Sequence, residues 1–387
     1  MRINILTLSL ILFLMVGLVE ATPSISDVAI NPTIPQSYDN LTVSIIASDT
    51  DGLNITNIYN WYKDGDLNMT TLLTPNELMF YLPLNNDTLD YWGTNNGTCS
   101  GGDACPTLNN TGGKIDGAYI FDGITNHDHI DLNSTLMEET FEETESLSIS
   151  VWVYPTFPTS DSNNRRIISC QNHWNSNPWY NNLGGFSIWY NNINGWTFGL
   201  RDQPTGGQKT VAKLPVGTFN TWHHIVATYD GSDMYIYVDG VKSSAGTSAS
   251  GGIYMTTYPA QIGGVWVHTV SEYQSIWNGT IDEVILYNKT LSDEEVLQLY
   301  YGGLWRGDVV DSSQTTAGEE WTAGPIALTF NESSSQVNDT VIIGGIIPPV
   351  FDTINLQNIF IVPFIKLNMI NFNNTPYVKL NESNIFN

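Results

Sequence analysis

Short stretches in which apolar and polar residues alternate recur along the chain and are bounded by turn residues. Such a period of two is typical of strands with one buried face. Asp-Gly pairs, which favour tight hairpin turns, stand at residues 51–52, 122–123, 230–231 and 239–240. The pattern predicts an all-β protein, with strands at residues 41–47, 148–154, 186–190, 222–228, 234–238, 280–287 and 340–343.

One helix is predicted near residue 292. Ser292 followed by Glu295 has the form of a capping box, in which each side chain binds the other residue's backbone N–H. Apolar residues follow at 296, 297 and 300, and Gly302-Gly303 predicts the end of the helix.

The middle of the chain resembles a known family at six points that come in the family's order. The motifs include GAYIFDG at 117–123, LSISVWV at 147–153, WHHIVATYDG at 222–231, MYIYVDG at 234–240 and NGTIDEV at 278–284. They resemble the laminin-G-like, concanavalin A-like jelly roll. The resemblance implies a two-sheet sandwich over residues 76–303, which agrees with the alternation of aromatic and polar residues in each motif.

The flanks of this region each contain about three predicted strands, at residues 25–30, 41–47 and 58–63 before it and at residues 308–311, 321–330 and 340–343 after it. Residues 22–75, with Trp61 on the third strand, and residues 304–345 resemble the two halves of an extracellular Ig/PKD-type module. We therefore predict a smaller Ig-like sandwich formed by discontinuous segments, with the jelly roll inserted between its third and fourth strands. Insertion requires that the ends of the jelly roll lie close together. The alternative is two independent β segments.

The N-terminal segment and the glycosylation sequons along the chain suggest export. Residues 1–21 have a basic start, an apolar run and small residues at 19 and 21, which predicts a secretory signal peptide; an uncleaved anchor is the alternative. N-x-S/T sequons from Asn40 to Asn381 suggest a glycoprotein. We expect a secreted or cell-surface protein whose mature chain does not enter the membrane. Residues 346–387 are β-prone and receive no assignment.

The three cysteines fit an exported protein. Cys99 and Cys105 flank a short Gly-rich loop and are predicted to form a disulfide. Cys170 follows an apolar run and is expected to be buried.

Charge narrows the choice of partner. The 387 residues include 13 Lys+Arg and 39 Asp+Glu, a net charge of −26, yet 41% are hydrophobic, enough for a large core. Nucleic acid is excluded as a partner because phosphate contacts need a basic surface. We expect a glycan or an extracellular protein, and a neutral glycan rather than an acidic one, because the acidic field repels anions.

The resemblance also implies a calcium site, since laminin-G-like jelly rolls often hold Ca²⁺. Calcium takes six to eight oxygen ligands, several of them carboxylates on loops. The candidate ligands in or beside the family motifs are Asp90, Asp122, Asp128, Asp131 and Asp282. The alternative for Asp122 is a hairpin Asp-Gly turn, and the alternative for Asp282 is a capping or pairing role within the closing strand.

Aromatic loops are the candidate sugar sites, because sugars stack their apolar faces on aromatic rings. One loop contains Trp174, Trp179 and Tyr180, and a second contains Trp266, His268 and Tyr273. Packing across a sheet edge is the alternative for both loops. The tryptophans in predicted strands are expected in the core, and Trp277 is expected to pack before the closing strand; the strand tryptophans are Trp152, Trp189 and Trp222.

Catalysis is the weakest candidate. Related glycoside hydrolases use two carboxylates at alternate positions of one strand. The nearest match, Asp282-Glu283, places adjacent acids that a regular strand points to opposite faces. His223 and His224 lie in a predicted strand and are expected to be structural. The sequence therefore favours a non-catalytic binding protein, with a structural adhesin as the main alternative and a glycoside hydrolase as the weaker one.

Overall fold

The computed structural model describes residues 22–73, 77–99, 105–123, 128–132, 146–158, 163–170, 185–201, 209–213, 218–249, 252–253, 259–267, 272–329 and 332–345. Only the backbone is described for residues 212–213, 266–267 and 272–274. The predicted signal peptide and the unassigned segment 346–387 lie outside this part of the chain.

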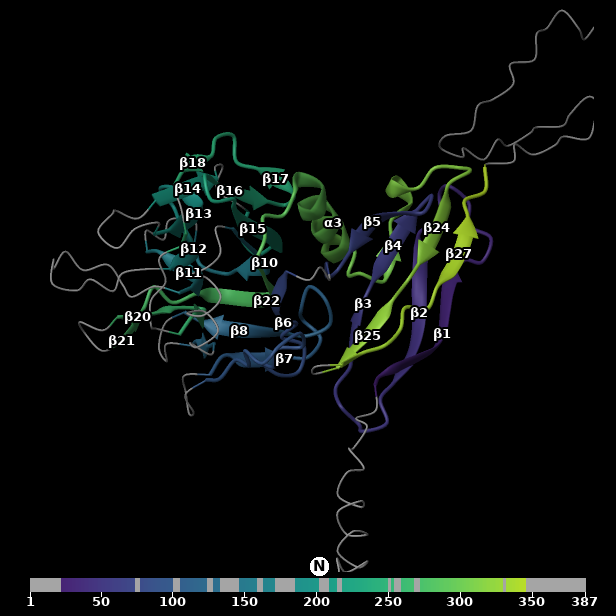
Figure 1. The fold of residues 1–387 in the computed structure, drawn as a ribbon, viewed down its shortest axis with the longest axis horizontal. Helices are drawn as coiled ribbons and strands as arrows, with labels where there is room; N and C mark the ends of the chain where they lie inside the picture. The colour runs from purple at the N-terminus through teal and green to yellow at the C-terminus, as the bar shows by residue number, and fades with distance from the viewer. Residues whose placement is uncertain are drawn as a thin grey trace, which may run out of the picture. The chain divides into compact units, whose positions relative to one another are not determined.

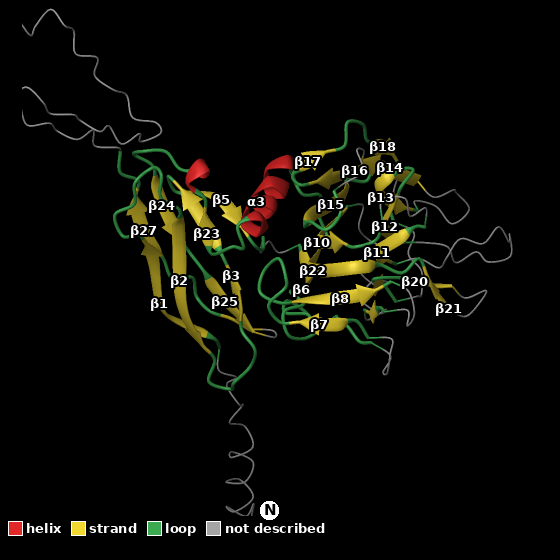
Figure 2. Ribbon diagram, turned by 180° about the vertical axis from the view of Figure 1, so that it is seen from behind, coloured by secondary structure: helices red, strands yellow, loops and turns green. Residues whose placement is uncertain are grey.

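The larger sandwich is built from two antiparallel sheets (Figure 1; Figure 2). The first has the order β17-β16-β15-β10-β22-β8-β7, with β6 beside β22 and β18 beside β16. Its strands are β6 Leu78–Leu82, β7 Thr107–Asn109, β8 Ala118–Asp122, β10 Leu147–Pro155, β15 His223–Tyr229, β16 Asp233–Val238, β17 Val241–Lys242, β18 Thr247–Ser248 and β22 Asn278–Tyr287.

The second sheet has the order β14-β13-β12-β11-β19-β9. Its strands are β9 Ile130–Asp131, β11 Arg165–Ser169, β12 Phe186–Asn191, β13 Gly195–Leu200, β14 Lys209–Lys213 and β19 Gln261–Ile262. A separate hairpin pairs β20 Val265–Val267 with β21 Glu272–Gln274.

The core lies between these two sheets, and strand alternation explains which residues enter it. On β12, Phe186, Ile188 and Tyr190 belong to the core cluster, whereas Ser187 and Trp189 do not. Each fully buried aliphatic or aromatic side chain contributes roughly 1.5–3 kcal/mol. The prediction of an all-β jelly-roll sandwich is confirmed.

A smaller sandwich is formed by the flanking segments. Its sheets have the orders β1-β2-β23, β27-β24-β4-β5 and β26-β25-β3. The strands are β1 Ser24–Asn31, β2 Leu41–Ser48, β3 Thr56–Ile58, β4 Asn60–Lys63, β5 Asp66–Thr70, β23 Val309–Val310, β24 Glu320–Ala323, β25 Ile326–Thr329, β26 Glu332–Ser333 and β27 Asp339–Ile342; a 3₁₀ turn, η2, spans Ser312–Gln314.

Each sheet of this sandwich combines strands from both flanks. β2 pairs with β23, β4 with β24, and β3 with β25. One apolar cluster contains Trp61 from the first flank and Trp321 from the second, both fully buried, and the Trp61 Nε1 donates to the Gly307 carbonyl at 2.8 Å. The two flanks are therefore packed against each other. That the sandwich is an Ig-like module interrupted by the jelly roll stays a prediction.

Two predicted strands of the flanks are each broken in two. The stretch 58–63 breaks at Tyr59, whose N–H is taken by the Thr71 hydroxyl at 3.0 Å, so β3 and β4 join different sheets. The stretch 321–330 breaks at Gly324-Pro325, where proline cannot donate to a strand ladder. Both breaks depend on tertiary contacts or a local proline rather than on the apolar pattern.

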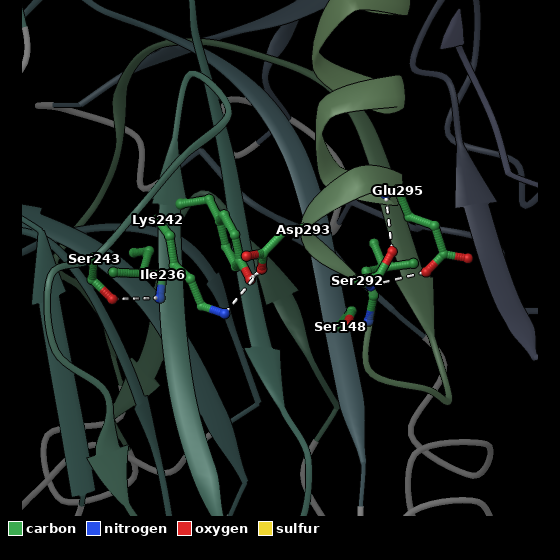
Figure 3. A network of polar contacts seen from close by, with 9 residues as sticks. Ser148, Ile236, Lys242, Ser243, Ser292, Asp293 and Glu295 are labelled. Atoms are coloured by element: carbon green, nitrogen blue, oxygen red, sulfur yellow. Dashed lines mark hydrogen bonds and ion pairs between the residues drawn. The ribbon is translucent and has the colours of Figure 1, made fainter. Parts of the chain in front are cut away.

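Helix α3, Asp293–Leu304, closes the larger sandwich and has the predicted capping box (Figure 3). The Glu295 N–H donates to Ser292 Oγ at 3.2 Å, and the Ser292 N–H donates to Glu295 Oε2 at 2.9 Å. Asp293 in the first turn accepts from Lys242 Nζ at 2.9 Å (Figure 3). Acidic residues at this end also complement the helix dipole.

The predicted end of α3 at Gly302-Gly303 was wrong, because the helix continues through both glycines to Leu304. These glycines allow close packing instead. A Cβ on Gly302 would lie 2.0 Å from the Thr70 carbonyl oxygen, and one on Gly303 would lie 2.4 Å from Trp152 Nε1. The left-handed glycine that follows the helix is Gly307, with φ +78°, and its N–H donates to the Gly302 carbonyl at 2.8 Å.

The cysteine predictions are confirmed: Cys99 and Cys105 form a disulfide, and the Cys170 side chain is fully buried in the core. In the part of the chain that the structure describes, no helix combines the length and the apolar character needed to span a membrane.

Candidate functional site: an aromatic cleft beside helix α3

A cleft of about 490 Å³ opens between the first sheet of the jelly roll and the C-terminal half of α3. Strand β10, the turns before β15 and after β16, the loop before β8, and α3 all contribute to it. It is lined by Lys114, Trp152, Tyr154, Thr218, Asn220, Thr221, Trp222, His223, Asp239, Tyr300 and Leu304.

Aromatic rings make up much of the cleft wall. The Trp152 ring stacks against Tyr300 of α3, with centroids 6.0 Å apart and planes 17° apart. Tyr154, two residues further along β10, contacts Trp222 edge-on at 5.6 Å. Trp152 is buried, whereas Tyr154, Trp222 and Tyr300 are each partly exposed. Three of the aromatic side chains that line the cleft are therefore partly exposed.

Strand β22 contains a bulge, and the bulge places Asp282 against the loop that carries Lys114. Ile281 and Val284 both belong to the core cluster, although a regular strand would separate core residues by two positions. The pairing of β22 with β10 shifts register here, and Glu283 has φ +52°. Asp282 and Glu283 therefore both lie on the face away from the core. The prediction that they point to opposite faces was wrong, because it assumed a regular strand.

Asp282 is fully buried and accepts backbone hydrogen bonds. Its Oδ2 accepts from the N–H groups of Lys114 at 2.7 Å and Ile115 at 3.1 Å, and its Oδ1 accepts from the Glu283 N–H at 2.9 Å. Burial raises the pKa of the Asp282 carboxyl, while these three donors act to lower it. The side chain thereby fixes the loop before β8.

Glu283 is also buried and accepts from the Tyr81 hydroxyl at 2.8 Å. Burial, followed by the charge of Asp282, raises the pKa of the Glu283 carboxyl well above its usual range. Neither acid lines the cleft.

Lys114 extends from this loop into the cleft. Its ammonium donates to the Leu304 carbonyl at 3.0 Å and lies 4.6 Å from the centroid of the Trp152 ring, a cation–π contact. Burial lowers the pKa of Lys114 to about 8, and the charge of Arg306 acts in the same direction. The side chain is therefore mostly protonated at neutral pH.

His223 and Asp239 form a hydrogen-bonded pair at the rim. His223 Nδ1 lies 2.8 Å from Asp239 Oδ2, and its Nε2 lies 2.6 Å from the Thr218 carbonyl oxygen. Burial lowers the pKa of His223, but the Asp239 carboxylate and the Thr218 carbonyl outweigh it, and the net shift is upward. The other Asp239 oxygen accepts from the His224 N–H at 2.9 Å. Both Asp239 oxygens are thus engaged.

His224 lies on the same face as Trp152, with ring centroids 4.9 Å apart. Burial lowers the pKa of His224 to about 3, so the ring is neutral. Its Nε2 lies 2.8 Å from Ser150 Oγ. This histidine has the structural role that the sequence predicts, whereas His223 lines the cleft.

Three of the five predicted calcium ligands, Asp90, Asp128 and Asp282, accept hydrogen bonds from backbone N–H groups. Asp90 is fully buried and accepts from the N–H groups of Tyr81, Trp92 and Asn95. Asp128 Oδ2 accepts from the Asp122 N–H at 2.8 Å, Asp282 is bound as described, and Asp131 Oδ2 lies 3.5 Å from His129 Nε2. Among the described residues, no three His, Cys, Asp or Glu side chains come together as a metal site. Calcium binding stays a prediction.

The predicted aromatic loops fall largely outside the described residues. This holds for Trp174, Trp179, Tyr180 and His268, whereas the backbones of Trp266 and Tyr273 pair in register across the β20–β21 hairpin. The roots of the two loops lie at opposite ends of β11, because the Cys170 N–H donates to Phe186 and the Arg166 N–H donates to Ser275. Four residues of strand separate these roots by roughly 13 Å.

Two of the three strand tryptophans are buried as predicted, and Trp222 is not. Trp152 and Trp189 lie outside the cluster between the two sheets, and Trp189 contacts the buried Arg166 guanidinium at 4.9 Å. Trp222 is partly exposed and precedes β15. Trp277 is confirmed as a packing residue, fully buried and edge-on to Phe157 at 5.3 Å.

Comparisons with known proteins agree with the fold. Residues 122–297 match the model of the concanavalin A-like lectin/glucanases superfamily. Curated protein sequences give no match to the chain.

Two solved structures illustrate the structural likeness. Domain 4 of AbnA, a GH43 extracellular arabinanase from Geobacillus stearothermophilus in complex with arabinotriose, has 19% identity and a TM-score of 0.37 over 58% of this chain and 98% of that chain. The botulinum neurotoxin serotype G binding domain has 17% identity and a TM-score of 0.42 over 57% and 50%. The match thus covers about half the length of the toxin domain. Scores this low carry no functional argument.

Proposed function

We propose, on the premise that residues 122–297 belong to the concanavalin A-like lectin/glucanases superfamily, that this protein is a secreted or cell-surface, non-catalytic binding protein whose jelly roll binds glycan. The binding site in this proposal is the cleft beside α3. The observation that carries it is the combination of three partly exposed aromatic side chains with polar groups in one concave site.

The chemistry of the cleft suits a sugar. Binding sites of this kind combine apolar and aromatic surface with a few placed polar groups. Trp222, Tyr154 and Tyr300 supply the aromatic surface, and the Asn220 amide and Thr221 hydroxyl lie beside them. No hydrogen bond within the described residues occupies the Asn220 or Thr221 side chain, so both are open to sugar hydroxyls.

Several contacts favour binding over hydrolysis. A retaining glycosidase needs two carboxyl groups about 5–5.5 Å apart on either side of the scissile bond. The adjacent acids Asp282 and Glu283 are both buried outside the cleft and hold the Lys114 loop and Tyr81. The one carboxylate that lines the cleft, Asp239, is bonded to His223 and to a backbone N–H.

Glycan binding by the full chain, on an array and then in titration, tests the proposal. We expect Trp222→Ala and Tyr154→Ala each to weaken binding at least about fivefold, because an aromatic contact contributes about 1 kcal/mol or more. Tyr38→Ala, at an exposed aromatic of the smaller sandwich, is the matched control and should leave binding unchanged. Trp174→Ala and Trp179→Ala test the loop predicted from the sequence.

Three other outcomes would redirect the assignment. Binding lost only in the Trp174 and Trp179 variants would move the site to that loop. Absence of binding to any glycan, together with self-assembly, would favour a structural adhesin. Polysaccharide turnover that Glu283→Gln abolishes would favour a hydrolase.

A further inference from the structure

The side-chain contacts of Lys114 differ from those of Lys63, Lys242 and Lys289. Lys63, Lys242 and Lys289 each form an ion pair with a carboxylate. Within the described residues, the Lys114 ammonium instead contacts the Leu304 carbonyl and the Trp152 ring. In a chain with 39 acidic and 13 basic residues, a half-buried ammonium without a carboxylate at ion-pair distance needs a reason.

The negative groups nearest to Lys114 are used elsewhere. Asp282 binds the backbone of the Lys114 loop. Asp239 is hydrogen-bonded to His223 and to the His224 N–H. Lys114 and nearby Arg306 are positively charged. Among the described residues, the cleft therefore holds an ammonium with no carboxylate at ion-pair distance, although the whole chain is strongly acidic.

The ammonium is held in place as well as exposed to the cleft. Asp282 fixes the backbone of the Lys114 loop. The Leu304 carbonyl accepts a hydrogen bond from the Lys114 ammonium, which lies over the Trp152 ring. Its other N–H donors have no hydrogen-bond partner among the described residues. A preorganised ammonium beside aromatic surface is the arrangement that binds an anionic group attached to an apolar ring face.

We propose that the cleft binds a sugar residue bearing one anionic substituent, a carboxylate or a sulfate ester, with the anion on the Lys114 ammonium and the ring against the partly exposed aromatics. This inference rests on the proposed glycan-binding function and names its ligand class. It differs from the expectation of a neutral glycan, which followed from net charge. At short range the local charge decides, because exposed charges beyond about 8–10 Å are screened at physiological salt.

An array of neutral, uronate-bearing and sulfated oligosaccharides, probed with the full chain, tests the inference. Each acidic glycan that binds is then titrated beside its neutral counterpart, obtained by carboxyl reduction or desulfation. We expect the acidic form to bind about tenfold or more tightly, as one charge-assisted hydrogen bond implies. Lys114→Gln should abolish that difference, and Lys114→Arg should retain most of it. The uronate and sulfate arms identify the anion.

Lys63→Gln is the matched control, since it removes one positive charge in the smaller sandwich and leaves the cleft intact. A preference that survives in Lys114→Gln, or falls equally in Lys63→Gln, would overturn the inference and leave the proposed function standing. Equal binding of acidic and neutral forms would do the same. Absence of binding to every glycan would overturn the proposed function itself. Thermal unfolding of each variant confirms that it is folded.

Discussion

Gly302→Ala tests how closely α3 packs on the smaller sandwich. In an isolated helix this change stabilises by about 1 kcal/mol, because alanine has a higher helix propensity. Here the new Cβ would lie 2.0 Å from the Thr70 carbonyl oxygen and 2.3 Å from the Thr70 carbonyl carbon. These are backbone atoms, so no change of rotamer relieves the contact. The helix would have to move by more than 1 Å to reach ordinary contact distance.

The loss of folding free energy that this displacement causes can be estimated from the contacts of α3. Moving α3 loosens the packing of buried Val296 and Leu299 and stretches the hydrogen bond from Gln298 Nε2 to the Leu67 carbonyl, now 2.8 Å. Overpacking costs about 1–3 kcal/mol, and one hydrogen bond contributes about 1 kcal/mol. After the gain in helix propensity, we expect net destabilisation of about 1–3 kcal/mol.

Urea unfolding followed by tryptophan fluorescence measures this change as a lower midpoint. Gly345→Ala is the matched control, because its added Cβ would meet only Ala317 at 3.7 Å, an ordinary contact. It should leave the midpoint unchanged. A Gly302→Ala variant as stable as the wild type, or more stable, would refute the close packing of α3 against β5.

Two further predictions concern titration and capping. Because the folded pKa of His223 is raised, its stabilising contribution is present below about pH 6.5 and is lost as the pH rises through the folded pKa. His223→Gln should remove this decline from a plot of Tm against pH above about 6.5. An identical decline in both proteins would contradict the prediction. Ser292→Ala removes the oxygen that accepts from the Glu295 N–H and should cost about 1 kcal/mol in urea unfolding, whereas an unchanged midpoint would show that the capping box contributes nothing.

The sequence predicts those parts of the fold that depend on local pattern. Alternation locates β10, β15, β16 and β22, because one face of each strand enters the core. The capping box is predictable for the same reason, since its two residues are three positions apart. The bulge at 282–283 is not predictable in this way, because it shows only in the pairing of β22 with β10. Neither is the helical role of Gly302, which depends on contact with Thr70.

The candidate site is harder to predict because its residues are distant in the sequence. Lys114, Trp152, Trp222 and Tyr300 come from four separate elements. One signal was available: Trp152 and Tyr154 alternate with the core residues Val151 and Val153, so two aromatics stand on the outer face of one strand. Residue type alone predicts that a strand tryptophan is in the core, whereas its position in the alternation decides which face it occupies.

The Lys114 ammonium has no ion pair within the described residues, although the chain has a net charge of −26, and the bonds of Asp282 help to explain why. Asp282 is fully buried and binds backbone N–H groups, so it positions Lys114 without forming an ion pair with the ammonium. An ion pair would fill the ammonium's donors and oppose an incoming anion, whereas a backbone anchor leaves them available. Asp282→Asn tests this distinction: the amide has a single acceptor oxygen, so it cannot accept from the two loop N–H groups and from the Glu283 N–H together, and the loop should loosen. We expect weaker binding of acidic glycans with Lys114 still present, and binding as in the wild type would show that the anchor is dispensable.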